Sequence, residues 1–261
     1  MPDDDDIALT EKRMYGARRE GTRVYVAGAL GVAYVDVSDD QIGRFGLAHR
    51  CRARDVAGED GRLLVATDED VLVGGEEFAD AGFGPAVAVG FADGPVAAGP
   101  DGRVARLGDD GWTTLGTLPA VRRLGGGYAA TAEGVYDLEG VHVGLDDARD
   151  VAAGYAATVE GVFRRADGWD LEEAGDATVV ATDGERAHAV VDGTLLERSE
   201  AGWWDADAPV TDPVDVAYGA ATFAVTADGR LALDPPAAKD GAPEWRSREL
   251  GLDDVTGLAV P

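Results

Sequence analysis

Short runs of alternating apolar and polar residues, separated by turns rich in Gly and Asp, recur along the whole chain of 261 residues. The clearest copies place two or three small apolar residues before a Glu-Gly or Asp-Gly turn and an apolar alternation after it, as around Gly134 and Gly161. Apolar alternation with period two is typical of strands, and Gly supplies the positive φ that tight hairpins require. Each copy therefore predicts a β-hairpin. The turns fall at residues 31, 70, 102, 134, 161, 193 and 229.

A second run of small residues precedes most of these turns and predicts an inner strand. Six copies occupy residues 55–58, 86–90, 121–125, 150–154, 178–181 and 215–219, and a seventh lies at residues 254–260. An aromatic residue after a polar turn predicts a fourth strand. It is Trp112, Trp169, Trp203 or Trp245 in four units, and Phe45 or Phe78 in two others. We expect the Trp side chains to pack between neighbouring sheets.

Four-stranded units repeated along a chain are typical of β-propellers. We therefore predict an all-β fold, a seven-bladed propeller of antiparallel blades, in residues 22–261 after an N-terminal arm, residues 1–21. The expected blades are 51–84, 85–119, 120–149, 150–177, 178–213 and 214–252, with a last blade that joins 253–261 to 22–50. That last blade closes the ring by pairing N- and C-terminal strands, which leaves no sheet edge open. A β-sandwich is the structural alternative.

Composition supports the repeat reading and limits the partners. With 37 Gly and 11 Pro spread along the chain, no long helix fits. The 50 acidic and 23 basic residues give a net charge of −27, which disfavours nucleic acid and anionic membranes as partners. Acidic residues spread evenly, with only two Lys, indicate a halophilic cytosol, since carboxylates hold water in molar salt. A cation-storage surface is the functional alternative.

The single thiol and the first residues of the chain favour a cytoplasmic protein. Cys51 is the single cysteine, so no internal disulfide forms. The first residues lack the basic and apolar regions of a signal peptide, and no apolar run has the length of a membrane span. We expect a soluble, cytoplasmic monomer.

Four segments carry a resemblance to a known family. They are Glu11-Lys-Arg-Met-Tyr15, Ala48-His-Arg-Cys-Arg-Ala-Arg-Asp-Val-Ala57, Ala66-Thr-Asp-Glu-Asp-Val-Leu-Val73 and Glu160-Gly-Val-Phe163. The chain resembles a family of haloarchaeal seven-bladed β-propellers over essentially its whole length. Residues 161–169 are also distantly similar to repeats of sialidase-like propellers, without their Ser or Thr before the Asp. The resemblance implies the fold and the host, and no activity.

Charged residues gather at or near the predicted starts of the inner strands, which in a ring point to one face near the axis. An arginine cluster there is unexpected on so acidic a protein and fits an anion or an acidic peptide. The alternative is that these residues pair with one another across blades. The candidate ligand- or partner-binding residues are Arg52, Arg54, Asp55, Arg122, Arg123, Arg149, Asp150, Asp215 and Asp254.

Catalytic and metal signatures are weak. Cys51 lies close to His49, but nothing in the sequence indicates a lowered thiol pKa. His142 and His188 are isolated, which disfavours zinc, and no calcium loop is present. We therefore predict no catalytic residue, no metal and no cofactor, and favour a non-enzymatic platform that presents loops or the axial rim to a protein partner. The alternative is a small anionic ligand-binding or hydrolase-type site in the axial funnel.

Overall fold

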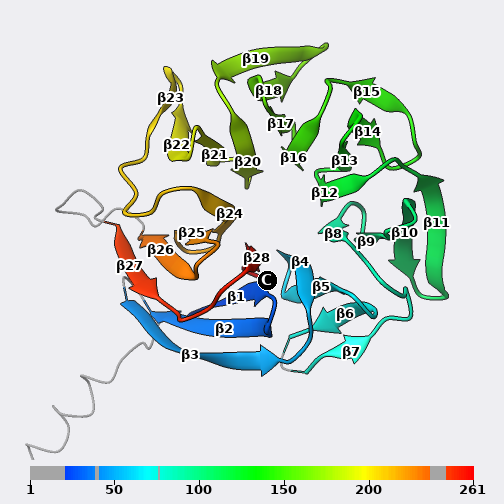
Figure 1. The fold of residues 1–261 in the computed structure, drawn as a ribbon, viewed down its shortest axis with the longest axis horizontal. Helices are drawn as coiled ribbons and strands as arrows, with labels where there is room; N and C mark the ends of the chain where they lie inside the picture. Colours follow the sequence, from blue (N-terminus) through cyan, green and yellow to red (C-terminus); the bar gives the residue numbers. More distant parts are fainter. Residues whose placement is uncertain (1–20, 39–40, 76, 236–244) are drawn as a thin grey trace, which may run out of the picture.

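The computed structural model describes residues 21–38, 41–75, 77–235 and 245–261. All regular structure in these ranges is strand, and the strands form seven four-stranded antiparallel sheets around one axis (Figure 1). The predicted all-β, seven-bladed propeller is confirmed. The predicted arm, residues 1–21, lies outside the described residues apart from Gly21.

The blades are numbered here along the chain, each given from its innermost strand outward. Blade 1 holds β28 (Val255–Ala259), β1 (Thr22–Gly28), β2 (Gly31–Ser38) and β3 (Gln41–His49); blade 2 holds β4 (Ala53–Glu59), β5 (Arg62–Thr67), β6 (Val71–Gly74) and β7 (Ala79–Asp80); blade 3 holds β8 (Ala88–Phe91), β9 (Pro95–Ala98), β10 (Arg103–Gly108) and β11 (Gly111–Thr117). Blade 4 holds β12 (Val121–Gly125), β13 (Tyr128–Thr131), β14 (Gly134–Asp137) and β15 (His142–Gly144); blade 5 holds β16 (Ala148–Ala152), β17 (Tyr155–Thr158), β18 (Gly161–Arg165) and β19 (Trp169–Ala174). Blade 6 holds β20 (Ala177–Thr182), β21 (Ala187–Val191), β22 (Thr194–Ser199) and β23 (Gly202–Asp205); blade 7 holds β24 (Pro213–Tyr218), β25 (Thr222–Thr226), β26 (Arg230–Asp234) and β27 (Arg246–Glu249).

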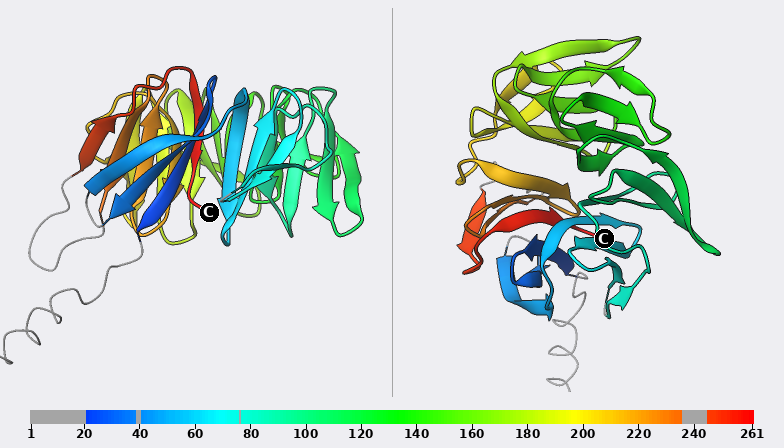
Figure 2. Two further views of the ribbon diagram at one scale, coloured as in Figure 1. Left: turned by 90° about the horizontal axis from the view of Figure 1, so that it is seen from below. Right: turned by 45° about the vertical axis from the view of Figure 1, so that its right-hand side comes forward.

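Ring closure uses strands from both ends of the chain. β28 pairs antiparallel with β1, with Tyr25 opposite Ala259 and Val26 opposite Leu258. The seven inner strands run through the thickness of the disc beside the axis (Figures 1 and 2). We call the side of the disc where inner strands begin the start face, and the side where they end the end face.

The predicted hairpin turns join the second and third strands of each blade. Six of the seven begin the third strand, or precede it by one residue, with a Gly at positive φ, such as Gly134 at 120° and Gly161 at 149°. In blade 2 the turn ends at Asp70, whose Oδ1 accepts hydrogen bonds from Val71, Phe83 and Gly84 N–H groups. A carboxylate there fixes the turn and the loop that leads to blade 3.

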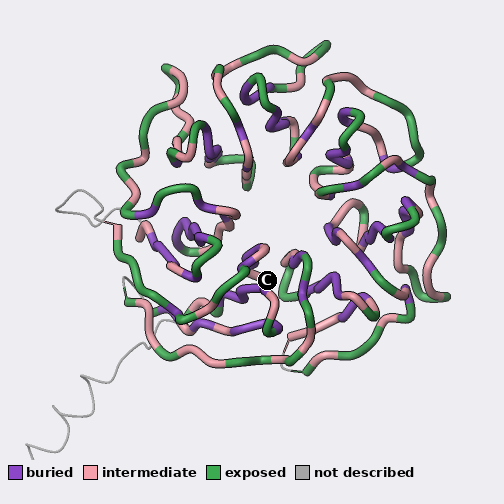
Figure 3. The backbone as a smooth tube through the Cα atoms, viewed as in Figure 1, coloured by how far each residue is buried: buried purple, intermediate pink, exposed green. Residues whose placement is uncertain are grey.

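The hydrophobic core is divided into seven clusters, each shared by two neighbouring blades. Burial is greatest in the second strand of most blades, as in β17, β21 and β25, and the outermost strands contain no buried residue (Figure 3). Trp indoles reinforce the junctions: Trp112 donates its Nε1–H to Ala81 O of the preceding blade at 2.9 Å, and Trp169 donates to Val143 O at 3.0 Å. The predicted packing of Trp between sheets is confirmed. Over the described residues, no helix has the length and apolar character of a membrane span.

Candidate functional site

One position of the repeat carries the charged side chains at the axis. The third residue is Asp55 in β4, Arg123 in β12, Asp150 in β16 and Asp215 in β24. The equivalent residues of the other three inner strands are small or apolar: Ala88, Val179 and Gly257. The propeller thus builds a ring at one level that holds three carboxyl groups and a single guanidinium.

A β-bulge in each of these four strands sets which side chain faces the axis. The pairing register shifts across the second residue, as between Ala53 and Asp55 or between Val121 and Arg123. A bulge re-aims the side chains beside it. As a result the third residue points to the axis, while the bulged second residue points away from it.

The three aspartates join neighbouring blades. Each accepts a backbone N–H from the inner strand of the next blade. The acceptor-to-donor pairs are Asp55 Oδ2 to Val89 N at 3.0 Å, Asp150 Oδ2 to Val180 N at 2.9 Å, and Asp215 Oδ2 to Leu258 N at 2.8 Å. The Asp-Val dipeptide of the repeat therefore serves the blade junctions, and Asp215 serves the junction where the ring closes.

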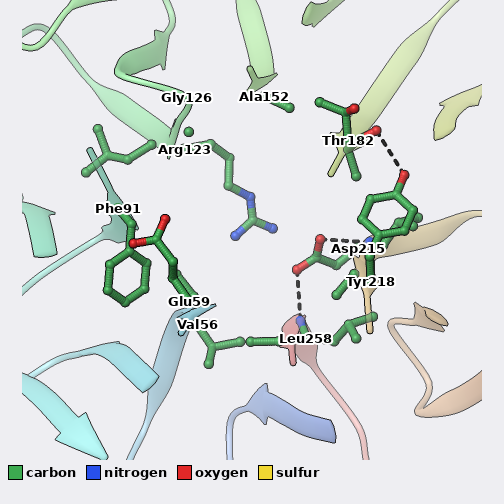
Figure 4. Close-up of a pocket in the computed structure, with 18 of the residues that line it drawn as sticks. Val56, Glu59, Phe91, Arg123, Gly126, Ala152, Thr182, Asp215, Tyr218 and Leu258 are labelled. Atoms are coloured by element: carbon green, nitrogen blue, oxygen red, sulfur yellow. Dashed lines mark hydrogen bonds between the residues drawn. The ribbon is translucent and has the colours of Figure 1, made fainter. Parts of the chain in front are cut away.

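Arg123 extends into the centre of the ring (Figure 4). Its Nη1 donates to Asp55 Oδ1, and its Nη2 donates to Thr256 O at 2.8 Å. The Asp55 side chain is 6% exposed and that of Arg123 is 24% exposed. Arg123 thus ties blade 4 to blades 1 and 2 across the axis.

The negative charges of the other two carboxyl groups, those of Asp150 and Asp215, are only weakly balanced by positive charge. Desolvation raises the pKa of Asp150 to about 6 and that of Asp215 to about 7, although Arg123 and backbone N–H groups oppose the shift. Desolvation also raises the pKa of Asp55, against the attraction of Arg123. The nearby carboxylates raise the pKa of Arg123, so it stays charged. At neutral pH the ring therefore holds more carboxyl groups than its one cation can neutralise.

This excess of carboxyl groups predicts that the free energy of unfolding depends on pH, and that the substitution Asp215→Asn removes this dependence. A carboxyl pKa raised on folding contributes stability at low pH, and that contribution is lost as pH rises through the folded pKa. We expect wild type to lose on the order of 2 kcal/mol more than Asp215→Asn between pH 4.5 and 8, at about 1.4 kcal/mol per pKa unit and discounted for solvent in the cavity. Urea unfolding of both proteins across this range measures the difference. Parallel curves would contradict the raised pKa.

Above the ring lies an axial cavity of about 680 Å³. All seven inner strands line it, from the charged ring to their last residues, so it opens on the end face. Nine Ala and Gly residues are among those that line it, including Ala57, Ala181 and Ala152, the last of which is labelled in Figure 4. The cavity thus opens opposite the start face, where the sequence placed the candidate rim.

Two acid–arginine–aromatic clusters flank the mouth. Glu59 pairs with Arg62 at 3.3 Å, and the Arg62 guanidinium lies 5.1 Å from the ring centroid of Phe91. Similarly, Asp183 pairs with Arg186 at 2.7 Å, and that guanidinium lies 4.8 Å from the centroid of Tyr218. With Asp60, the lining carries six carboxyl groups, and the three arginines at the ring and mouth leave an acidic excess.

The structure separates the nine predicted site residues into two groups. Asp55, Arg123, Asp150 and Asp215 line the axial cavity. The other five do not line it: Arg52, Arg54, Arg122, Arg149 and Asp254.

Of the five arginines expected near the axis, Arg123 alone lines the axial cavity, and the bulged positions direct Arg54, Arg122 and Arg149 to other partners. Arg122 pairs with Asp147 at 2.6 Å and Arg149 pairs with Asp176 at 2.5 Å, in both cases the residue just before the next inner strand. Arg52 and Arg54 both pair with Asp68, and Asp254 lies in the loop before β28. The alternative of pairing across blades describes Arg122 and Arg149.

Sequence reasoning missed the residues that line the mouth, including Glu59, Phe91, Asp183 and Tyr218. They stand at the ends of inner strands or in the turns after them, whereas the residues predicted from the sequence lie at or near the strand starts. Their position in the sequence could have identified them, because they follow the ring residues or their equivalents by three to five residues.

The thiol and the histidines form no reactive group. Burial and the charge of Glu69 raise the pKa of Cys51, which disfavours a thiolate. The His49 ring stacks on Phe78 at 5.1 Å. Buried His188 hydrogen-bonds through Nδ1 to Tyr218 Oη at 3.0 Å, and desolvation lowers its pKa to about 4. Across the described ranges, no three His, Cys, Asp or Glu side chains are grouped to hold a metal ion.

Comparison with sequence families decides where this propeller belongs. A model of the HVO_0234-like β-propeller family matches residues 8–261. The chain belongs to this family. The match spans every blade of the ring, as the resemblance found in the sequence implied. Among curated protein sequences, none matches the chain.

Solved structures similar to this HVO_0234-like propeller include those of Ika8, PorZ and Doa1. The computationally designed protein Ika8 has a TM-score of 0.52 and 12% identity, over 93% of this chain and 91% of its own. PorZ, a surface component of the type-IX secretion system of Porphyromonas gingivalis, has a TM-score of 0.43 and 18% identity, over 85% of this chain and 38% of PorZ. The WD40 propeller domain of Doa1 has a TM-score of 0.46 and 10% identity, over 93% of this chain and 86% of its own. At 12% identity, the likeness to Ika8 shows the fold alone.

Proposed function

We propose that this HVO_0234-like propeller is a non-catalytic binding platform whose axial cavity receives a cationic side chain of a protein partner. The observation that carries the proposal is the charge of the ring: three carboxyl groups, Asp55, Asp150 and Asp215, face one guanidinium, Arg123. An entering Lys or Arg would supply the missing positive charge and let Asp150 and Asp215 ionise. A cavity of about 680 Å³ accommodates such a side chain.

The charge also disfavours the alternative of an anionic ligand in the funnel. An anion in the cavity would meet the acidic excess of its lining. The arginines that the alternative depends on, such as Arg122 and Arg149, already have carboxylate partners. Among the described residues, those that line the axial cavity include no Ser or Cys that could act as a nucleophile.

The test places a competing cation at the mouth. Ala153 is an exposed turn residue that lines the cavity, so Ala153→Arg adds a guanidinium there. Ala132→Arg, in the exposed turn between β13 and β14 on the start face, makes the same charge change outside the cavity. We expect calorimetry in molar KCl to show saturable binding of a Gly-Gly-Arg-Gly-Gly peptide that falls at least tenfold in Ala153→Arg. Equal affinities in the two variants would overturn the proposal.

We infer further that the acidic surface adapts the protein to a cytosol of molar salt, as its 50 acidic residues and two Lys indicate. Lowering the salt concentration lengthens the screening distance from about 3 Å at 1 M to about 10 Å at 0.1 M, and the carboxylates then repel one another. We expect unfolding, followed by emission of the five Trp residues, to begin as KCl falls well below molar. Equal stability in dilute buffer and in molar KCl would contradict this adaptation.

A further inference from the structure

A shallow apolar groove lies at the seam between blades 7 and 1, away from the axis. Its volume is about 230 Å³. Leu30 and Leu47 line it and are 59% and 47% exposed, two of the six exposed large hydrophobic side chains among the described residues. Phe45 of β3 and Leu252 of the loop before β28 complete its apolar surface. Clustered leucines in contact with water mark interaction sites more often than single ones do.

The groove adjoins an arginine-rich stretch of the sequence, in which Arg44 pairs with Asp36 while Arg52 and Arg54 pair with Asp68. Residues 41–54 contain four arginines and neither Asp nor Glu, in a chain with a net charge of −27. Arg50 lines the groove and makes no hydrogen bond or ion pair with any described residue. This stretch includes part of the segment 48–57 that carries the family resemblance.

A second arginine, from the neighbouring blade, packs against Phe45 beside the groove. Arg248 of β27 donates from Nη1 to Ile42 O at 2.9 Å and to Gly43 O at 2.6 Å. Its guanidinium lies 4.9 Å from the ring centroid of Phe45. Arg248 therefore holds the two blades together at the groove, and within the described chain it has no carboxylate partner.

We propose that this groove binds a protein segment with alternating acidic and aliphatic side chains. Leu or Ile side chains of that segment cover Leu30 and Leu47, and an Asp or Glu carboxylate pairs with Arg50. Arg recognises a carboxylate with two parallel hydrogen bonds, so the free guanidinium of Arg50 fixes the register of the bound segment. Charge complementarity selects this partner over a basic one, because Arg50 is the charged residue that lines the groove itself, whereas Asp253 lies beside it with Leu30 and Leu252.

Salt separates this site from the axial cavity. The net charge of −27 repels an acidic segment at low ionic strength, and molar salt screens that repulsion while it strengthens apolar burial. Binding at the groove therefore increases with salt. Binding of a cation at the axial cavity decreases with salt, so the two proposals fail or succeed independently.

The test uses the full chain and a fluorescein-labelled Glu-Asp-Leu-Leu-Asp-Leu peptide, with fluorescence anisotropy in molar KCl. The groove variant is Leu47→Gln with Arg50→Gln. The matched control is Leu171→Gln with Arg164→Gln on blade 5, where both side chains are also about half exposed. We expect saturable binding that falls at least tenfold in the groove variant and stays within twofold of wild type in the control.

Three results would overturn the assignment. The first is absence of saturable binding by wild type, and the second is an equal loss in the groove and control variants. The third is a concentration-dependent dimer that the groove variant dissociates, which would assign the groove to a second copy of the chain. A peptide in which Ser replaces each Leu should bind at least tenfold more weakly, since it retains the charge alone.

Discussion

A chain that lacks residues 253–261 is expected to lose its cooperative unfolding transition. The deletion removes β28, the inner strand of blade 1, in which Val255, Leu258 and Ala259 are buried. Burial of each Val or Leu contributes about 1.5–3 kcal/mol, and a whole domain is stable by only about 5–15 kcal/mol. The deletion also removes the N–H that Asp215 accepts and leaves the edge of β1 unpaired. Circular dichroism during heating and size-exclusion chromatography measure the loss and the resulting aggregation.

Two controls separate strand loss from a general defect. Leu258→Ala keeps the strand and should cost only about 2–4 kcal/mol, so a cooperative transition remains at a lower temperature. A synthetic peptide with the sequence of residues 253–261 should restore folding of the truncated chain when added in excess. A truncated chain that melts at the wild-type temperature would refute ring closure by β28.

Asp55→Ala is expected to have the largest effect of any single substitution at the axis. It leaves Arg123 without its carboxylate partner in a desolvated ring and removes the acceptor of Val89 N–H. Loss of one member of a buried ion pair costs about 3–5 kcal/mol. Because Arg123 is 24% exposed and Asp150 and Asp215 also attract it, we expect about 2–3 kcal/mol. Guanidinium chloride unfolding at pH 7 measures the free energy of unfolding.

A double mutant assigns the cause. Asp55→Ala with Arg123→Met removes both charges, so its free energy of unfolding should exceed that of Asp55→Ala alone. Asp55→Asn retains an oxygen acceptor and should fall between wild type and Asp55→Ala. If the double mutant is less stable than Asp55→Ala by the full cost of a second substitution, the two side chains are not coupled.

Local patterns in the sequence were enough to predict the blades. Gly at 134 and 161 takes up the positive φ that the hairpin turns need, wherever the rest of the chain lies. The inner strand predicted at 254–260 is the one copy with no hairpin after it in the sequence. It pairs with β1, because blade 1 also needs an inner strand. Trp112 and Trp169 stand at the same place in their units and make the same contact with the preceding blade.

The candidate site could be predicted only in part. Asp55, Asp150 and Asp215 were recognised as residues of the repeat, and they do serve the junctions between blades. Whether Arg122 or Arg123 faces the axis could not be predicted, because a one-residue bulge decides which of the two side chains does so. Residues such as Glu59 and Tyr218 come together at the mouth only once the ring closes.

The sequence by itself determined the seven-bladed ring, its closure and its acidic charge, since these follow from local turn chemistry, strand periodicity and composition. Only the tertiary structure decided that Arg123 is the one guanidinium at the axis among the described residues, that the cavity opens on the end face, and that Leu30, Leu47 and Arg50 share a groove with Leu252. The physical reason is that hairpins form from residues a few positions apart. Charge balance at an axis and exposure at a seam depend on side chains from different blades, whose positions are fixed only when the ring is complete.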